Sequence, residues 1–297
     1  MFRPSRTVLP LLMSTLLAAA SLPAAAQAVP NEQSVALLNS VLWTQQSVEH
    51  GAATQALYRA AGNALRAAVK QPGWASLETG PATTGRKAIV MDIDETLVDN
   101  SAYSAWMVQS GKPYDEPSWQ AWVALRQATA LPGAVEFVKL AGRLHVDVFF
   151  VTNRECVPQG DDPCPAFAHT RDNLVALGFA RAAEPGALML RKQRPEWSAG
   201  DKSARRQFIA QTHRIVMLFG DDMGDFLPVA NVEALRAGQA DAATTRAMGL
   251  LGSRWFVIPN PMYGSWEKAV PHGIPERIGA LKPPQGWAAS APADAAR

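Results

Sequence analysis

The stretch AIVMDIDETLVDN, residues 88–100, decides the fold. It begins as an apolar run typical of a buried strand and ends in two aspartates, Asp92 and Asp94. Side chains alternate along a strand, so we expect both carboxylates to point into one crevice at its carboxyl end. In open α/β sheets ligands bind at that end. Two like charges held so close repel each other unless a cation or a shared proton relieves them. The stretch therefore predicts a metal-assisted reaction centre.

The first 28 residues are typical of a secretory signal peptide. Arg3 and Arg6 precede an apolar run over 8–22, and small residues ending at Ala28 offer a cleavage site. The run is too short for a comfortable membrane span. The chain has no cysteine before Cys156 that could carry a lipid. We expect cleavage after Ala28 and a periplasmic or secreted product without a membrane anchor.

Charge excludes some classes of partner. The leader holds two of the 28 basic residues and none of the 26 acidic ones, so the remaining chain is close to neutral. A neutral balance argues against a broad surface for nucleic acid polymers or anionic membranes.

The sequence also lacks the motifs of several other enzyme classes. The five histidines have no zinc-ligand spacing, and no serine-hydrolase or P-loop motif occurs.

Hydrophobic periodicity predicts helices over 31–69, divided at Gly51, and an irregular aromatic segment over 103–122. Further helices are expected over 134–141, 167–177 and 200–211 and before Gly238, and strands over 145–151, 187–190, 214–219 and 255–258. The expected organisation is a signal peptide over 1–28, amino-terminal helices contributing to a cap over 29–85, a core over 86–282 with a cap insertion at about 100–131, and a disordered tail over 283–297.

Strands that alternate with helices predict an α/β fold with a Rossmann-like parallel sheet, helices on both faces and a small, mostly helical cap. Three of the strands end in polar clusters, which begin at Asp92, Thr152 and Asp221. Carboxyl ends of parallel strands lie at one edge of a sheet, so we expect these clusters to converge.

The converging residues suit phosphoryl transfer, where catalysis is positioning plus charge neutralisation. Carboxylates are ligands that Mg²⁺ prefers, and Asp92 and Asp221 are candidates, with the Asp94 carbonyl as a further ligand. Asp92 would attack phosphorus and Asp94 would transfer the proton. Thr152, beside Asn153, and Lys202 would contact phosphoryl oxygens, and Asp225 would hold a metal-bound water.

Other interpretations of these residues stay open. Lys192 is a rival for Lys202, and Asp221 and Asp225 are also suited to capping a helix. Asp222 is interpreted as a solvated neighbour. Tyr103 and Tyr263 are as compatible with core packing as with contact to a substrate, and Trp106, Trp119 and Trp122 are interpreted as cap packing first and as a substrate wall second.

Cys156 and Cys164 are the only cysteines and lie eight residues apart in a polar loop. In an exported protein this pair is most simply a disulfide. The alternative, a metal or redox pair, lacks a histidine at ligand spacing.

Four segments, DIDETLVDNSAYSAW, FFVTNR, DKSARRQF and FGDDMGDF, occur in this order. They resemble the motifs of haloacid dehalogenase-like (HAD) phosphatases, and most closely the exported class C acid phosphatases, which include lipoprotein 5′-nucleotidases. The likeness runs from about 89 to 267. It implies Asp92 as nucleophile, Asp94 as acid/base, Mg²⁺ surrounded by the aspartates and a nucleoside base between two aromatic rings. The positions that match the phosphate-binding residues are Thr152, Asn153 and Lys202. Those that match the metal site are Asp92, Asp94, Asp221 and Asp225, and those that match the rings around the base are Tyr103 and Tyr263.

Together these features predict an exported acid phosphatase that hydrolyses phosphate monoesters, nucleoside 5′-monophosphates above all, through an aspartyl-phosphate. Two alternatives stay open: a phosphotransferase that uses alcohol acceptors, and a non-catalytic binding or storage protein on the same scaffold. A homo-oligomer is compatible with the sequence.

Overall fold

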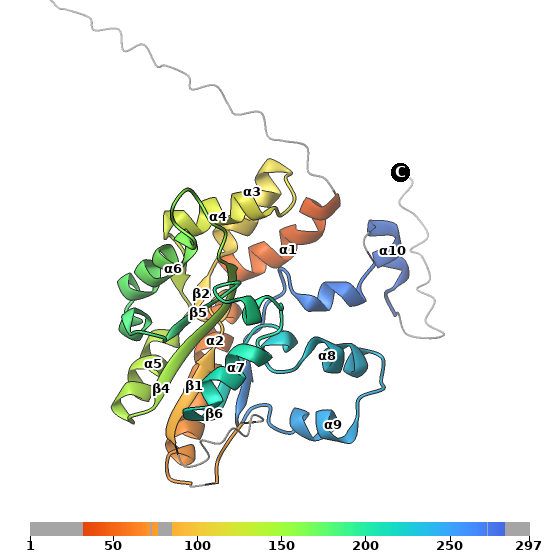
Figure 1. Cartoon of the computed structure of the whole chain (residues 1–297). Coiled ribbons are helices and arrows are strands. Elements are labelled where there is room, and N and C mark those ends of the chain that lie inside the picture. The colour runs from red at the N-terminus through yellow and green to blue at the C-terminus, as the bar shows by residue number, and fades with distance from the viewer. Residues whose placement is uncertain (1–31, 72, 77–84, 272, 283–297) are drawn as a thin grey trace, which may run out of the picture.

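A five-stranded parallel sheet forms the centre of the molecule (Figure 1). The computed structural model describes residues 32–71, 73–76, 85–271 and 273–282. The strand order is β5-β4-β1-β6-β7, with β1 at Arg86–Met91, β4 at Asp147–Glu155, β5 at Leu188–Arg191, β6 at His213–Gly220 and β7 at Trp255–Val257. From β1 the chain builds outward to β4 and β5, and then returns to place β6 on the other side of β1. The strand order therefore reverses between β1 and β6, which is where ligands bind in such sheets.

Two hydrophobic layers cover the sheet, because alternate side chains of each strand point to opposite faces. Ile89 and Met91 of β1 belong to the layer shared with α2, α5 and α6, whereas Ala88 and Val90 belong to the layer shared with α7, α8 and α9. The bounds are Val48–Ala68 for α2, Ala134–Arg143 for α5, Pro165–Ala176 for α6, Ser203–Ala210 for α7, Val229–Arg236 for α8 and Ala242–Met248 for α9. The predicted Rossmann-like α/β fold is confirmed.

Helices α1, α3 and α4 gather at one end of the sheet (Figure 1). They span Glu32–Gln46, Ser101–Ser110 and Glu116–Leu125, and a small antiparallel pair, β2 at Val98–Asp99 and β3 at Thr129–Ala130, frames α3 and α4. Helix α1 packs against α3, and α4 packs against α6. Short 3₁₀ helices η1 to η4 lie at Ala180–Ala183, Pro195–Trp197, Met223–Asp225 and Ser265–Ala269, and α10 spans Ile274–Gly279.

The amino-terminal helices divide at Ser47, so the predicted break at Gly51 is wrong. The Ser47 side chain accepts a hydrogen bond from the backbone N–H of His50 at 3.1 Å, which is an N-terminal cap of α2. Gly51 lies inside α2, where a Cβ atom would be only in ordinary van der Waals contact with Pro132, at 3.8 Å, so this glycine does not break the helix. Further along α2, the Tyr58 hydroxyl donates to the carbonyl of Thr96 at 2.6 Å and so contacts the turn after β1.

The aromatic segment over 103–122 is helical rather than irregular. Gly111, with φ of 65°, ends α3, and the Asp115 carboxylate accepts from the N–H of Ser118 at 2.8 Å to begin α4. The aromatic residues of this segment follow no clear apolar stripe, so hydrophobic periodicity alone does not predict these two helices. The predicted signal peptide and tail lie outside the described residues. None of the described helices combines the length and hydrophobicity needed to cross a membrane.

Candidate active site

The Asp92 carboxylate lies directly beyond the end of β1. Its backbone N–H donates to the carbonyl of Phe219 at 3.0 Å, so Asp92 is held against β6. Its side chain accepts a hydrogen bond from Lys202, which directly precedes α7 and is only 2 % exposed. The same ammonium group lies 2.7 Å from Oδ1 of Asp225. Lys202 therefore joins two carboxylates that follow neighbouring strands.

Asp221 and Asp225 form an acidic cluster with Asp92 beyond the ends of β1 and β6. One carboxylate oxygen from each lies within 4.8 Å of the others. Such an oxygen set suits a hard divalent cation. Three ionised carboxylates beside the single ammonium of Lys202 leave an excess of negative charge, which a divalent cation balances. The residues present therefore fit a divalent metal.

Burial in this cluster raises carboxyl pKa values. Burial raises the pKa of Asp92 to about 7; the Lys202 ammonium opposes this shift, and the charges of Asp225 and Asp94 add to it. Burial, reinforced by the charges of Asp92 and Asp225, raises the pKa of Asp221 well above its usual range. Burial alone would lower the pKa of Lys202, but Asp225 and Asp92 together raise it. Without a cation the cluster thus retains protons, and a bound cation favours its ionised form.

Asp94 has a separate set of hydrogen-bond partners. Its carboxylate accepts from the Arg154 guanidinium at 2.7 Å, from the Thr152 hydroxyl at 3.1 Å and from the Asn100 amide at 2.9 Å. Asp92 and Asp94 therefore lie two residues apart but bond different cations, Lys202 and Arg154. Different surroundings allow two neighbouring carboxylates to take different roles.

Thr152 and Asn153 lie at the carboxyl end of β4, the neighbour of β1. Thr152 is fully buried. The Asn153 side chain donates to the carbonyl of Gly200 at 2.8 Å and accepts from Arg205 at 2.8 Å. Arg205 also donates to the carbonyl of Thr152 at 2.5 Å. Asn153 and Arg205 thus fix the loop that carries Lys202 to the end of β4.

A family model described as HAD superfamily, subfamily IIIB (acid phosphatase), matches residues 10–266. The chain belongs to this family of acid phosphatases. Two solved structures of the class C acid phosphatase from Bacillus anthracis are similar to this phosphatase. One is 30% identical with a TM-score of 0.65, over 80% of this chain and 89% of that chain. The other, with tungstate bound, is 30% identical with a TM-score of 0.68, over 84% and 98%. The chain is thus a phosphoric monoester hydrolase.

Four residues that hold the site of the phosphatase were not identified from the sequence. Arg154 and Arg205 are described above. The Arg206 guanidinium donates to the carbonyl of Asp225 at 2.5 Å, and the Asn260 amide donates to Asp221 at 2.8 Å. The sequence does carry a signal for Arg205 and Arg206: they follow Lys202 by three and four residues in DKSARRQF, where a helix begins, and so lie on the same side of that helix as Lys202. Asn260 lies after β7, and its approach to Asp221 depends on the sheet order.

Asp222 and Asp225 both have structural partners in the turn after β6. Asp222, interpreted from the sequence as solvated, caps η3 by accepting from the N–H of Gly224 at 2.7 Å. It also accepts from the N–H of Ser265. Asp225 completes the capping box through Oδ2, which accepts from the N–H of Asp222 at 3.1 Å. Asp225 therefore both ends this turn and pairs with Lys202.

The alternative lysine lies away from the acidic cluster. Lys192 is 49 % exposed and pairs with Glu155 at 2.5 Å.

The two tyrosines matched to a nucleoside base lie in different parts of the phosphatase. Tyr103 of α3 is 5 % exposed, and its ring stacks on Trp106 with centroids 5.6 Å apart. Tyr263 lies in the loop after β7 and is partly exposed.

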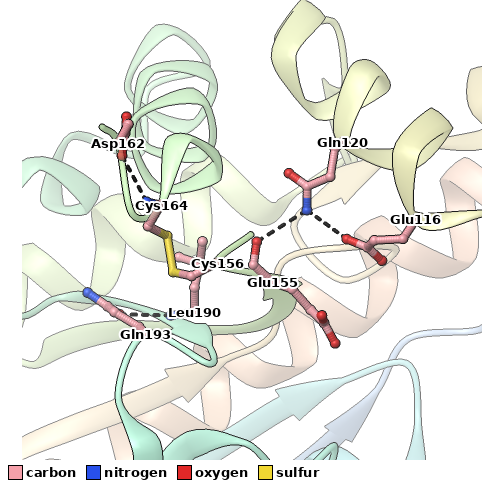
Figure 2. The surroundings of a disulfide bond; sticks show 8 residues. All are labelled: Glu116, Gln120, Glu155, Cys156, Asp162, Cys164, Leu190 and Gln193. Atoms are coloured by element: carbon pink, nitrogen blue, oxygen red, sulfur yellow. Dashed lines mark hydrogen bonds between the residues drawn. A yellow bond between two sulfur atoms is a disulfide. The ribbon is translucent and has the colours of Figure 1, made fainter. Parts of the chain in front are cut away.

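A disulfide joins Cys156 and Cys164 beside the end of β4 (Figure 2). Cys156 directly follows β4, and Cys164 is the N-cap residue of α6. Figure 2 also shows the Gln120 side chain between the carbonyl of Glu155 and the carboxylate of Glu116, at 3.2 and 2.7 Å. The strand end next to the site is thus attached both to α6 and to α4.

Proposed function

We propose that the protein hydrolyses phosphate monoesters through a covalent aspartyl-phosphate on Asp92. The observation that carries the proposal is the position of this carboxylate, which is buried beyond β1, bonded to Lys202 and close to Asp221 and Asp225. An anionic nucleophile must approach an anionic phosphate, so nearby positive charge is essential. Lys202 provides a fixed positive charge at that point.

In the first step an Asp92 oxygen attacks phosphorus and the bond from phosphorus to the ester oxygen breaks. Asp94 donates a proton to the departing oxygen. In the second step Asp94 takes a proton from water, which attacks phosphorus and releases inorganic phosphate and the Asp92 carboxylate. Thr152, Asn153 and Lys202 would bind the phosphoryl oxygens, which requires Thr152 to redirect its hydroxyl from Asp94.

We propose Mg²⁺ as the metal, held by Asp92, Asp221 and Asp225 with the backbone carbonyl of Asp94 as a further ligand. When bound, Mg²⁺ supplies positive charge that offsets the charge on the phosphoryl oxygens. The Asp94 carboxylate would remain with Arg154 and Asn100. Removal of metal with a chelator, followed by titration with Mg²⁺, Mn²⁺, Ca²⁺ or Zn²⁺, tests the choice of metal. Greater restoration of activity by another ion would contradict it.

Asp92→Asn tests the nucleophile. We expect it to abolish hydrolysis of p-nitrophenyl phosphate without changing the circular dichroism spectrum. Acid quenching during turnover of ³²P-labelled substrate should trap label on the wild type and none on the variant. Asp172→Asn, at a partly exposed pair with Arg171 on α6, is the matched control. An unchanged rate in the Asp92 variant would refute the assignment.

We propose nucleoside 5′-monophosphates as substrates, with Tyr263 and Tyr103 contacting the base. Because Tyr103 is buried against Trp106, direct stacking by Tyr103 requires Trp106 to move aside. Tyr263→Ala should raise KM for adenosine 5′-monophosphate several-fold and leave KM for p-nitrophenyl phosphate unchanged. Equal changes for both substrates would contradict base stacking.

We also propose that residues 1–28 direct export and are removed, with α1 and α2 retained in the mature protein. The disulfide supports this proposal, because such bonds persist in oxidising compartments. Mass spectrometry of the mature protein from periplasmic and extracellular fractions tests it. A cytosolic protein with the first residues intact would contradict it.

A further inference from the structure

We propose that Arg154 is a positioning residue that orients the Asp94 carboxylate for proton transfer; the proposal rests on the acid/base role proposed for Asp94. Arg154 directs two nitrogens at this carboxylate. Nη2 lies 2.7 Å from Oδ1, and Nε lies 3.0 Å from Oδ1 and 3.2 Å from Oδ2. A planar guanidinium that meets both carboxylate oxygens fixes the plane of the carboxylate as well as its position.

The protein holds Arg154 itself in one orientation. Its Nη1 donates to the buried hydroxyl of Thr170 in α6 at 3.1 Å. The guanidinium carbon lies 5.8 Å from the ring centroid of Trp119 in α4. The backbone N–H donates to the Thr152 hydroxyl at 3.0 Å. Contacts from α6 and α4 thus hold the arginine that orients Asp94.

The backbone that follows Arg154 is also held in place, at Glu155 and Cys156 (Figure 2). The next residue, Glu155, accepts from Gln120 of the cap through its carbonyl. The residue after that, Cys156, forms the disulfide with Cys164 at the start of α6. The strand end therefore cannot turn away without breaking contacts to α4 and α6.

A direct role of Arg154 in phosphate binding does not fit the structure. The side chain is 3 % exposed, and Nε, Nη1 and Nη2 all donate to protein oxygens. Lys202 already provides the cation beside Asp92. Arg154 thus acts on the reaction through Asp94. Loss of its two-nitrogen contact would leave the Asp94 carboxylate held by the Asn100 amide and the Thr152 hydroxyl, without the planar partner that fixes its orientation.

The test measures how the rate depends on the leaving group. Proton donation matters most when the departing oxygen is strongly basic, as in glycerol phosphate, and least for p-nitrophenyl phosphate. We expect Arg154→Lys and Arg154→Gln to lower kcat for glycerol phosphate about 100-fold or more, the size typical of general acid catalysis, and for p-nitrophenyl phosphate about tenfold or less. KM should change less than about twofold. A merely structural defect would lower both rates equally.

Two further variants provide a second test of the Arg154 contact and a control. Thr170→Val removes the anchor of Nη1 but keeps all charges, so it should show the same leaving-group pattern with a smaller loss, even where the Arg154 variants fail to fold. Arg171→Gln, at the partly exposed Arg171–Asp172 pair, is the control and should leave both rates unchanged.

Asp94→Asn separates the proposal from its premise. If Asp94→Asn shows the leaving-group pattern but the Arg154 and Thr170 variants lower both rates equally or not at all, the positioning role is refuted and the acid/base role stands. If Asp94→Asn itself lowers both rates equally, the acid/base role fails, and the inference about Arg154 fails with it.

Discussion

Gly220, the last residue of β6, leaves the space that the side chain of Asp225 fills. A Cβ atom at Gly220 would collide with both the Cβ atom and the carboxylate of Asp225. Gly220→Ala should therefore displace Asp225 from Lys202 and from the acidic cluster. A shift of about 1 Å in such a site costs on the order of 100-fold in rate.

Steady-state kinetics and calorimetric Mg²⁺ titration check the Gly220 prediction, and both activity and metal affinity should fall. The matched control is Gly142→Ala, because a Cβ at Gly142 would meet no atom within 4 Å. Wild-type kinetics in Gly220→Ala would show that the Asp225 position does not matter.

The stability of the metal-free protein should fall as pH rises from about 4 to about 7. Asp92 has a pKa of about 7 in the folded protein and an ordinary value of 3.8. Between these values the folded state binds more protons than the unfolded state, so rising pH favours unfolding. Thermal unfolding in chelator at pH 5, 6, 7 and 8 measures the effect. Asp92→Asn should flatten the dependence, and Mg²⁺ should raise the melting temperature most at pH 8. Equal slopes for wild type and variant would exclude Asp92 as the source.

Loss of the disulfide should destabilise the protein. The bond closes a short loop, with a sequence separation of 8 residues between Cys156 and Cys164. Loop-closure entropy predicts a loss of about 2–3 kcal/mol in the free energy of unfolding for the double serine variant. Urea unfolding of oxidised, reduced and variant protein provides the measurement. Identical midpoints for all three would show that the bond contributes nothing.

Arg205→Lys should lower activity although the charge is kept. Only a guanidinium reaches both the Thr152 carbonyl and the Asn153 side chain with parallel donors. Loosening this contact frees the loop that carries Lys202, so we expect kcat/KM to fall at least about tenfold, corresponding to one lost hydrogen bond to a charged group. Arg246→Lys, at an exposed position of α9, is the control. Equal kinetics in the Arg205 and Arg246 variants would contradict this role of Arg205.

The sheet and the acidic cluster could be predicted because both follow from local patterns. The apolar strands before Asp92, Thr152 and Asp221 indicate parallel neighbours, and parallel neighbours bring their carboxyl ends together. The break at Ser47 could have been found as well, since a serine followed by Glu49 in the first turn is a common helix start.

The supporting contacts could not be predicted in the same way. Arg154, Arg205 and Asn260 have partners far apart in the sequence, and the side-chain packing of the folded protein decides which of them is buried. An arginine beside a motif is most often exposed. The different surroundings of Asp92 and Asp94 also depend on these partners, although the alternation along a strand predicts that both point the same way.

The hydrogen bond from Tyr58 to the carbonyl of Thr96 links α2 to the turn that follows Asp92 and Asp94. Tyr58 is buried, and its ring stacks on Phe219 of β6 with centroids 5.8 Å apart. A shortened chain that starts at residue 85 would lack Tyr58 and therefore its contacts with Thr96 and Phe219. The catalytic motifs alone would thus make an incomplete enzyme, and recombinant fragments or domain fusions should retain everything from α1 onward.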